Sequence, residues 1–503
     1  MENRFNLVDE PWIPVADVGN VSLRQVFENT KLRMLGGTPV QKVAVTKLLL
    51  AIAQAAATPD NEDGWRSLGS DGLAKRCCDY LDRWYDRFYL YGDQPFLQMP
   101  EVSRAAVQSF GATLPEISTG NTTVLSQSQV DRELTDSEKA VLIVSLMGFA
   151  LAGKKTDNKV TLTPGYRGKL NNNNKPSSSK PGPSLGFMGF LHSLLLGSTL
   201  HETLWLNMLT HAQVQQTNMF PEGVGTAPWE AMPEGEDCAT ARALAQSLQG
   251  RLVPLCRFCL LTDSGLHYSE GVPHPGYKEG VVDPTVAINY SGKEPKALWV
   301  NPEKRPWREL TSLLSFIGQE KSQGFHSHQI ALGLGRVRDV MDSFAIWSGG
   351  LRVSSNAGEQ YVSGSDDFVE SIVWLDSDLL GAIWFSNLKA EMDALDTLAK
   401  GLYGRVSMFF KEQKMDGSKL AAQASHLFWQ LCERRFQDLV DSCGTDPESQ
   451  DRRTQLRRQF AGYVHQAYDQ ICPRETARQL DAWAKCRPNT RQFLQQETVN
   501  HGS

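Results

Sequence analysis

The last quarter of the sequence carries four consecutive amphipathic helix patterns joined by short connections. In the first pattern, apolar residues recur at steps of three and four, as Trp384, Leu388, Met392, Leu395, Ala399 and Leu402. Steps of this size place side chains on one face of a helix. Because each stripe needs a partner surface, residues 376–503 predict a C-terminal four-helix bundle.

Local signals mark the ends of these helices. The run 376–378, Asp-Ser-Asp, is expected to cap the first helix. Asp446 followed by Pro447 has the residue types of an N-cap and a first helical position, and Pro473 ends that third helix. A fourth, shorter helix is expected from about residue 475 to 485.

The first 375 residues mix short strands with helices. Apolar segments at 40–57 and 136–151 predict core helices, and 188–209 predicts a further helical stretch. A chain of 503 residues exceeds one ordinary core. The sequence therefore predicts an α+β fold, with a large mixed α/β domain over 1–375 and the helical bundle over 376–503.

Composition and charge exclude some classes of protein. The chain is 41% hydrophobic and 21% charged, which is typical of folded domains, and its formal charge of −6 excludes a histone-like polyanion binder. Residues 401–503 nevertheless hold 15 Lys+Arg against 12 Asp+Glu, so this end is expected to face an anion. No membrane span or secretory leader is expected, and nine scattered cysteines favour reduced thiols in the cytoplasm.

Residues 151–186 form a long segment dominated by Gly, Asn, Ser and Pro, which predicts a loop. Seven cations lie in it against the single acid Asp157: Lys154, Lys155, Lys159, Arg167, Lys169, Lys175 and Lys180. Cations on such a backbone attract phosphates, so the segment is a candidate nucleic-acid contact. A disordered, solvated insertion is the alternative.

Two glycine-rich turns are further candidates. The turn 164–168, Pro-Gly-Tyr-Arg-Gly, would let backbone approach a ligand in a narrow groove where a side chain would collide. The segment 348–358, which follows Trp347, is expected to turn tightly. Its small polar tip would either insert between bases or simply close a hairpin.

Paired arginines at 434–435, 452–453 and 457–458 lie on the predicted bundle. Steps of four to five residues can align them on one helix face, where they would follow a phosphate backbone. Pairing with Asp438, Asp441 or Asp451 would make the same surface an ordinary solvated face.

Catalytic and metal signals are weak. Cys256 and Cys259 have the spacing of half a zinc knuckle but no second pair nearby, which favours ordinary cysteines. His326 and His328 form an HxH pair without an evident third ligand, which favours a loop before a helix starting near Val337. A metal-dependent nuclease or hydrolase using these histidines is the alternative function. No phosphate-binding, dinucleotide or protease motif is found, and no cofactor is expected.

The order of several short motifs resembles a known family. Residues 6–15, NLVDEPWIPV, and 94–98, QPFLQ, resemble CasA, the large subunit of the type I-E CRISPR surveillance complex Cascade. The turn at 164–166, the segment 197–209 and the WSGGLR motif at 347–352 occur in the family's order. The resemblance covers nearly the whole chain.

This resemblance implies a non-catalytic subunit that reads a protospacer-adjacent motif (PAM) from the minor groove and wedges the duplex open. The expected PAM and DNA contacts are Gly165, Tyr166, Arg167, Gly168, Lys278, Lys154 and Lys155, with the wedge at Ser355, Asn356 and Ala357. The expected contacts to the guide-RNA handle are Leu125, Ser126, Gln127 and Ser128. The expected contacts to the displaced strand are Arg434, Arg435, Arg453 and Arg457.

The implied partners are other Cascade subunits, the CRISPR guide RNA, double-stranded target DNA and an effector helicase-nuclease, without a membrane. A plain interaction scaffold remains as a third possibility. It would show no preference among duplexes that differ only at a short motif.

Overall fold

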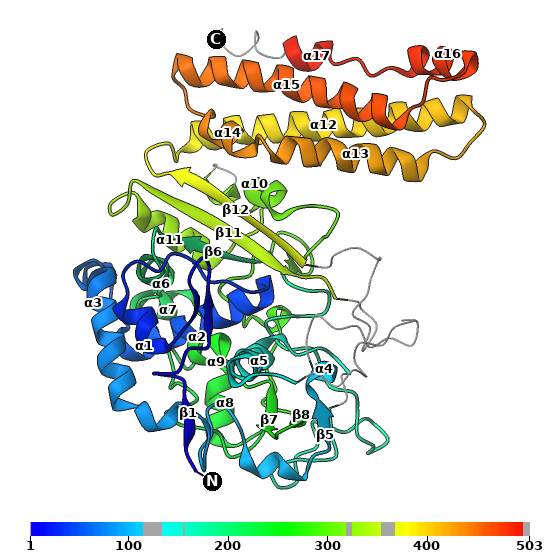
Figure 1. Ribbon diagram of the computed structural model, residues 1–503. Helices are drawn as coiled ribbons and strands as arrows, with labels where there is room; N and C mark the ends of the chain where they lie inside the picture. The colour runs from blue at the N-terminus through cyan, green and yellow to red at the C-terminus, as the bar shows by residue number, and fades with distance from the viewer. Residues whose placement is uncertain (1, 114–132, 154–155, 318–323, 354–367, 496–503) are drawn as a thin grey trace. The chain divides into compact units, whose positions relative to one another are not determined.

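The computed structural model describes residues 2–113, 133–153, 156–317, 324–353 and 368–495. The chain divides into two compact units (Figure 1). The first comprises Met1–Trp307, Ser322–Val340 and Phe344–Ile372, and the second comprises Arg308–Lys321, Met341–Ser343 and Val373–Ser503. The first mixes helices with small sheets and the second is mainly helical, so the predicted α+β class is confirmed.

A buried helix, α2 (Pro39–Ala57), organises the core of the first unit. It packs against α3 (Glu62–Arg83), α5 (Asp136–Phe149) and α9 (Leu248–Leu252). Thr38 begins α2 with a capping box, and α2 has the length and apolar composition of a membrane span. However, 72% of that apolar window is buried inside the protein, so α2 serves here as a core helix.

Within the described residues, two sheets have three strands each. One has the order β12-β11-β6, with β6 (His192–Leu196) antiparallel to β11 (Ser343–Leu351) and β12 (Phe368–Asp376) on the other side of β11. The other has the order β5-β8-β7, and pairs Arg257 with Glu270 across β7 and β8. Its strands are β5 (Val107–Ser109), β7 (Arg257–Leu261) and β8 (Gly265–Glu270).

The remaining strands and the other helices of the first unit are short. The part of the chain that the structure describes also holds three two-stranded pairs: β1 (Arg4–Asn6) with β4 (Tyr89–Tyr91), β2 (Ile13–Val15) with β3 (Gly19–Val21), and β9 (Ile288–Asn289) with β10 (Lys296–Ala297). The other α-helices of the first unit are α1 (Leu23–Glu28), α4 (Phe110–Thr113), α6 (Leu200–Asn207), α7 (His211–Thr217), α8 (Ala239–Ala245) and α11 (His328–Val337).

Two predictions in the first unit are wrong. The stretch 188–209 is not one helix, because β6 precedes α6. The apolar residues of β6 are buried on both faces, and such a run has no period that separates strand from helix. The second error concerns Gly349 and Gly350, which lie inside β11 rather than in a turn. A Cβ on Gly350 would lie 2.5 Å from the Phe190 carbonyl oxygen, so close packing explains this glycine.

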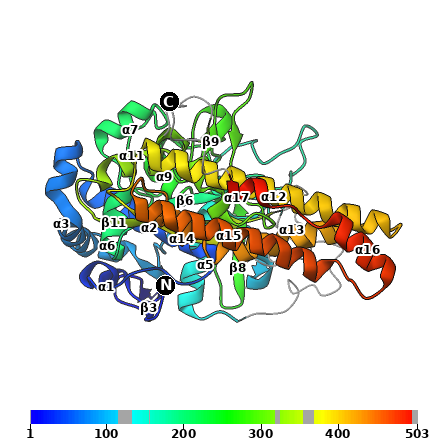
Figure 2. The same ribbon diagram turned by 90° about the horizontal axis from the view of Figure 1, so that it is seen from above.

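The second unit is built on three long helices that lie side by side in both ribbon views (Figures 1 and 2). They are α12 (Ala382–Glu412), α13 (Ser418–Glu433) and α15 (Pro447–Ile471). The shorter helices of this unit are α10 (Leu310–Leu313), α14 (Phe436–Asp441), α16 (Ala477–Cys486) and α17 (Arg491–Gln495). The expected apolar stripe of α12 is buried from Trp384 to Leu402.

The helix ends follow the sequence signals in part. Asp446 caps α15, and its Oδ1 accepts from the Ser449 N–H at 2.9 Å, as predicted. The expected cap at 376–378 is wrong, because β12 continues to Asp376 and α12 begins only after Gly381. Asp376 instead accepts from the Asp378 N–H at 2.9 Å, within a turn.

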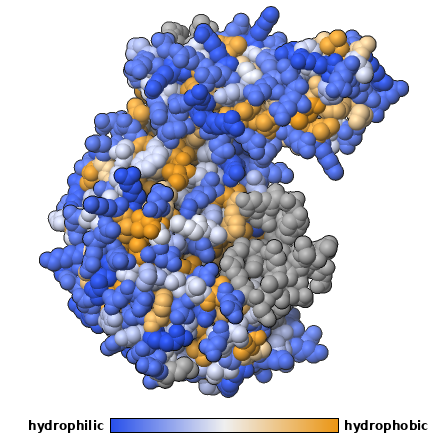
Figure 3. Space-filling view, viewed as in Figure 1, coloured by the Kyte–Doolittle hydropathy of each residue, from blue (hydrophilic) through white to orange (hydrophobic). Residues whose placement is uncertain are grey.

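The surface of the helical unit is mainly hydrophilic but carries hydrophobic patches (Figure 3). Its exposed large apolar side chains include Tyr403, Met408, Met415 and Leu480. This unit therefore keeps apolar surface that its own helices do not bury.

Candidate nucleic-acid interface

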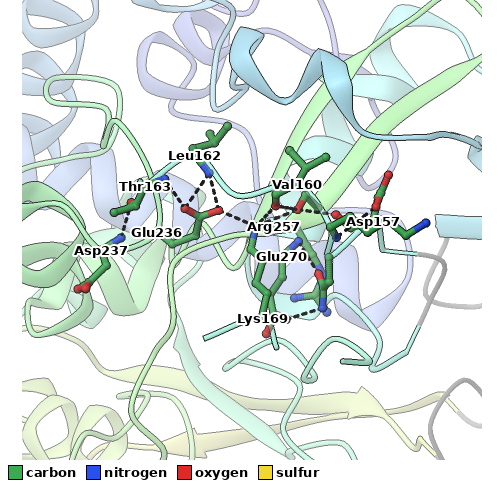
Figure 4. Close-up of polar contacts among 12 residues, drawn as sticks. Asp157, Val160, Leu162, Thr163, Lys169, Glu236, Asp237, Arg257 and Glu270 are labelled. Atoms are coloured by element: carbon green, nitrogen blue, oxygen red, sulfur yellow. Dashed lines mark hydrogen bonds and ion pairs between the residues drawn. The ribbon is translucent and has the colours of Figure 1, made fainter. Parts of the chain in front are cut away.

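The glycine-bearing loop of residues 160–170 stands on a buried ion pair (Figure 4). Lys169 Nζ lies 2.6 Å from Glu236 Oε1, and the two side chains are 1% and 0% exposed. The same ammonium donates to the Val160 carbonyl at 2.8 Å and to Ser269 Oγ at 2.9 Å. Because Lys169 reaches back to Val160, it joins the two ends of the loop.

Glu236 fixes the part of the loop just before the tip by accepting hydrogen bonds from backbone N–H groups (Figure 4). Its carboxylate accepts from the N–H of Leu162 at 3.0 Å and of Thr163 at 2.8 Å. Irregular backbone cannot satisfy its own donors, so a buried acceptor of this kind specifies the loop conformation. Burial alone would raise the pKa of Glu236, but the Lys169 ammonium and the N–H groups outweigh it and lower that pKa.

The tip of the loop is open to solvent. Gly165 is exposed and has φ +74°, and a Cβ there would meet nothing within 4 Å. Glycine is therefore favoured at 165 by backbone conformation rather than by packing. Tyr166 is half-buried and folds over Gly168, where a Cβ would clash with its hydroxyl; burial raises the pKa of Tyr166 to about 12.

The cations of the long loop separate into two kinds. Lys169 is a structural group, so its expected contact with phosphate is wrong. Four others are exposed, namely Lys159, Arg167, Lys175 and Lys180. Lys154 and Lys155 lie outside the described residues. From 156 to 186 the segment contains no helix or strand beyond one isolated bridge, Leu170 with Pro176, so the predicted loop is confirmed there.

Lys278 lies on a short 3-10 turn, Tyr277–Glu279. Its side chain is 57% exposed, and Nζ lies 2.7 Å from Glu294 Oε2. An exposed pair of this kind contributes little to stability, so the ammonium can exchange its partner for a phosphate or a base edge. Lys278 and Lys180 both line one cavity of about 490 Å³.

Besides Lys154 and Lys155, seven expected contacts fall outside the described residues. These are the wedge residues Ser355, Asn356 and Ala357, and the guide-RNA handle residues Leu125, Ser126, Gln127 and Ser128. Their roles stay predictions.

Two of the bundle arginines, Arg457 and Arg453, are engaged within the protein, so their predicted contact with a displaced strand is wrong. Arg457 is buried, and its Nη2 lies 2.6 Å from Glu391 Oε1, so it holds two helices together. Arg453 is half-buried and donates to the carbonyl oxygens of Gly444, at 2.8 Å, and of Ser442.

Two arginines of this set stay exposed. Arg434 and Arg435 follow α13, and Arg435 pairs with Asp438 at 3.1 Å. This pairing is the solvated-face alternative that the sequence left open. Arg434 is thus the better placed of the two to meet an external anion.

The residues considered as metal ligands do not form a metal site within the described part of the chain. Among the described residues, no group of three or more His, Cys, Asp or Glu side chains is arranged to hold a metal ion. The rings of His326 and His328 meet edge to face at 4.6 Å, and His328 begins α11, so the helix expected near Val337 starts earlier. Cys256 and Cys259 are free and buried, and burial raises the pKa of Cys259 to about 12.

Sequence reasoning missed Glu236, which is the acceptor that shapes the loop. It lies far from Lys169 in the chain, and no local spacing links the two. Glu236 stands beside Glu234 and Asp237 in a Gly- and Pro-containing segment, and no pattern singles it out from them.

Comparison with known proteins agrees with this fold. The sequence model of the family described as CRISPR-associated protein Cse1 matches residues 6–470. The CRISPR-associated protein CasA/Cse1 of Thermus thermophilus is 28% identical over 340 residues, which span 62% of this chain and 60% of that relative. The chain belongs to the Cse1 family, and the resemblance seen in its sequence is confirmed.

Solved structures share the fold over nearly the whole chain. Thermus thermophilus CasA has a TM-score of 0.74 at 21% identity, covering 98% of this chain and 99% of that one. Thermobifida fusca Cse1 has a TM-score of 0.76 at 18% identity, covering 97% of each chain. A chain of a "CRISPR RNA-guided surveillance complex" has a TM-score of 0.69 at 16% identity, covering 97% and 99%.

Proposed function

We propose that this chain is the large, non-catalytic subunit of a type I-E RNA-guided antiviral surveillance complex in the cytoplasm. Family membership and the likeness to a chain from such a complex support this function. Its partners would be other Cascade subunits, the guide RNA, double-stranded target DNA and a helicase-nuclease. Exposed apolar side chains on the helical unit suit contacts with protein partners.

Within that complex, the tip at Gly165–Gly168 would read the PAM from the minor groove. The observation that carries this proposal is an exposed, left-handed glycine on a loop whose base is locked by a buried ion pair. The minor groove is about 6 Å wide and shows a degenerate pattern of acceptors. A narrow tip can enter it, and a rigid base means that little ordering entropy is lost on binding.

Neighbouring residues would extend the contact. Lys278 would leave Glu294 and enter the groove, while Lys154 and Lys155 would meet phosphates. Ser355, Asn356 and Ala357 would form the wedge, at a cost of a few kcal/mol per unstacked base step. The segment Leu125–Ser128 would meet the RNA handle, and Arg434 with Arg435 would meet the displaced strand.

The alternative of a metal-dependent nuclease is not retained. His326 and His328 have no further ligand arranged around them within the described residues. Burial lowers the pKa of His328 to about 4, with a smaller effect from His326.

A matched pair of glycine variants tests the PAM proposal. Gly165→Ala strains the left-handed backbone of the tip, and Gly223→Ala imposes the same kind of strain at φ +65°, also with nothing within 4 Å of the new Cβ. Each variant would be assembled into the complex and titrated with duplexes that contain or lack the PAM.

We expect Gly165→Ala to weaken binding to the PAM duplex by about tenfold or more, because one lost groove contact is worth about 1–3 kcal/mol. Gly223→Ala should bind like the parent chain. Equal affinity of the two variants for the PAM duplex would show that the loop does not contact the PAM.

A further inference from the structure

The cavity of about 490 Å³ in the first unit has the size of a small-molecule site. Its lining comes from segments that are far apart in the sequence, including Phe190, Arg251, His274, Tyr277 and Trp299. The glycine tip 165–168 does not line it. The cavity is therefore separate from the glycine tip, although Lys278, a proposed groove contact, lies in its lining.

Arg251 presents a buried positive charge to this cavity. It is 2% exposed, and its Nη2 donates to the Pro275 carbonyl at 2.8 Å, while Nε has no hydrogen-bond partner. Within the part of the chain that the structure describes, its guanidinium forms no direct ion pair, and Asp283 and Glu279 act on its charge only from a greater distance. Burial lowers the pKa of Arg251 to about 10, so the group still carries its charge at neutral pH.

Two acids, Glu270 and Asp283, also line the cavity, and Asp283 is already engaged by other groups. Asp283 accepts from the Lys47 ammonium and from Thr285 Oγ1, the latter at 2.7 Å. A buried charge without a direct ion-pair partner is costly, and an anion that enters the cavity would supply such a partner. The arrangement therefore selects for an anionic group at Arg251.

His274 also lines the cavity and carries a second unsatisfied atom. Its Nε2 contacts the Pro254 carbonyl, which can only accept, so Nε2 carries the proton. Burial, with the Arg251 charge, lowers the pKa of His274 to about 3, so the ring is neutral. Nδ1 is then a buried acceptor without a partner, and it suits a hydroxyl or N–H donor of a ligand.

Aromatic side chains form another part of the lining. Phe190 and Trp299 stack at 4.6 Å, and Tyr277 meets both rings edge-on at 5.8 and 6.2 Å. Phe187 also lines the cavity while its surface is 58% exposed. Such a wall favours a flat ring, and exposed Lys180 and Lys278 add positive charge beside it.

We propose that this cavity binds a single nucleotide, with the phosphate at Arg251, a sugar hydroxyl at His274 and the base against the aromatic wall. The nucleotide can be a free mononucleotide or one unit of a nucleic-acid strand, since both present the same three groups. The inference does not depend on PAM reading and is tested on the isolated full chain.

Calorimetric titration of the full chain with AMP, adenosine, inorganic phosphate and a short single-stranded oligoadenylate tests the site. The expected order is AMP or the oligonucleotide above adenosine and phosphate, because only these carry both ring and anion. AMP binding indicates a free nucleotide, and binding of the oligonucleotide alone indicates a strand. Failure of both to bind, or phosphate binding as tightly as AMP, would overturn the proposal.

Arg251→Met removes the charge while keeping apolar volume. We expect at least about a tenfold loss of affinity, since hydrogen bonds to charged groups are the stronger kind. The matched control is Arg242→Met, an exposed arginine on α8, which should bind unchanged. A second variant, Tyr277→Ser on the aromatic wall, should also weaken binding and keeps the test decisive if Arg251→Met folds poorly. Unchanged affinity in a folded Arg251→Met or in Tyr277→Ser would contradict the proposal.

Discussion

Each of the two units buries an ion pair, but the pairs do different work. In the first unit, Lys169 and Glu236 hold an irregular loop, and Glu236 also accepts two backbone N–H groups. In the helical unit, Arg457 and Glu391 join α15 to α12, whose backbones already satisfy their own hydrogen bonds.

The difference shows where a buried charge specifies structure. A helix pair can be held by apolar packing alone, so its ion pair is replaceable. A loop without regular hydrogen bonds needs its buried acceptor, because the N–H groups of Leu162 and Thr163 would otherwise lose their partner. The exposed tip at Gly165 therefore depends on a buried residue 71 positions later in the chain.

The largest expected effect is that of Glu236→Gln. It leaves the Lys169 charge buried without a counter-ion, which typically costs about 3–5 kcal/mol. Urea denaturation should show this loss, and limited proteolysis should show faster cleavage within residues 160–170. The control is Glu234→Gln, an exposed neighbour that should change neither. Parent-like stability of Glu236→Gln would mean that the pair does not hold the loop.

The second prediction replaces both members of each pair. Arg457→Met with Glu391→Leu should be neutral or stabilising by about 1–4 kcal/mol, because packing substitutes for the pair. Lys169→Met with Glu236→Leu should destabilise, because each buried N–H left without an acceptor costs about 1–3 kcal/mol. The urea midpoints of the two double variants measure this difference. A change of stability in the same direction in both would contradict the prediction.

The third and smallest effect is the acid sensitivity of the first unit. Burial alone would raise the pKa of Asp283, but Lys47 and His192 lower it to about 2. A carboxyl whose folded pKa is depressed stabilises the fold above its unfolded pKa, near 4, and this stability is lost as pH falls toward 2. The loss is on the order of 2 kcal/mol.

Glu236 adds to this loss, because its pKa is also lowered in the folded chain. Urea midpoints measured between pH 7 and pH 2 should fall, and Asp283→Asn should flatten the dependence. An unchanged slope in Asp283→Asn would show that this carboxyl is not the group that titrates.

The sequence predicted regular structure better than it predicted the site. The stripe from Trp384 to Leu402 and the cap at Asp446 were sufficient for α12 and α15, because helical periodicity is local. The helix predicted over 188–209 was wrong in part, because the buried strand β6 has no alternation of apolar and polar residues that would distinguish it from a helix. For the loop, the exposed turn at Gly165 was visible in the sequence, but the burial of Lys169 was not.

Charge in a sequence does not say which cations are free. Lys169 and Arg457 look like their exposed neighbours in the chain, and only a distant acid, Glu236 or Glu391, makes each of them structural. Pairing of this kind is a tertiary property. The pairing of Lys169 and Arg457 removes two of the expected anion contacts. Arg167 and Arg434, by contrast, are exposed.

The most direct test of the proposed function is photo-crosslinking from the loop tip. A photoreactive amino acid in place of Arg167, in the assembled complex, would be irradiated with duplexes that carry or lack the PAM. The account predicts crosslinks to the base pairs of the PAM, and loss of these crosslinks when Glu236→Gln loosens the loop. Crosslinks to protein alone, or DNA crosslinks that ignore the PAM, would contradict it.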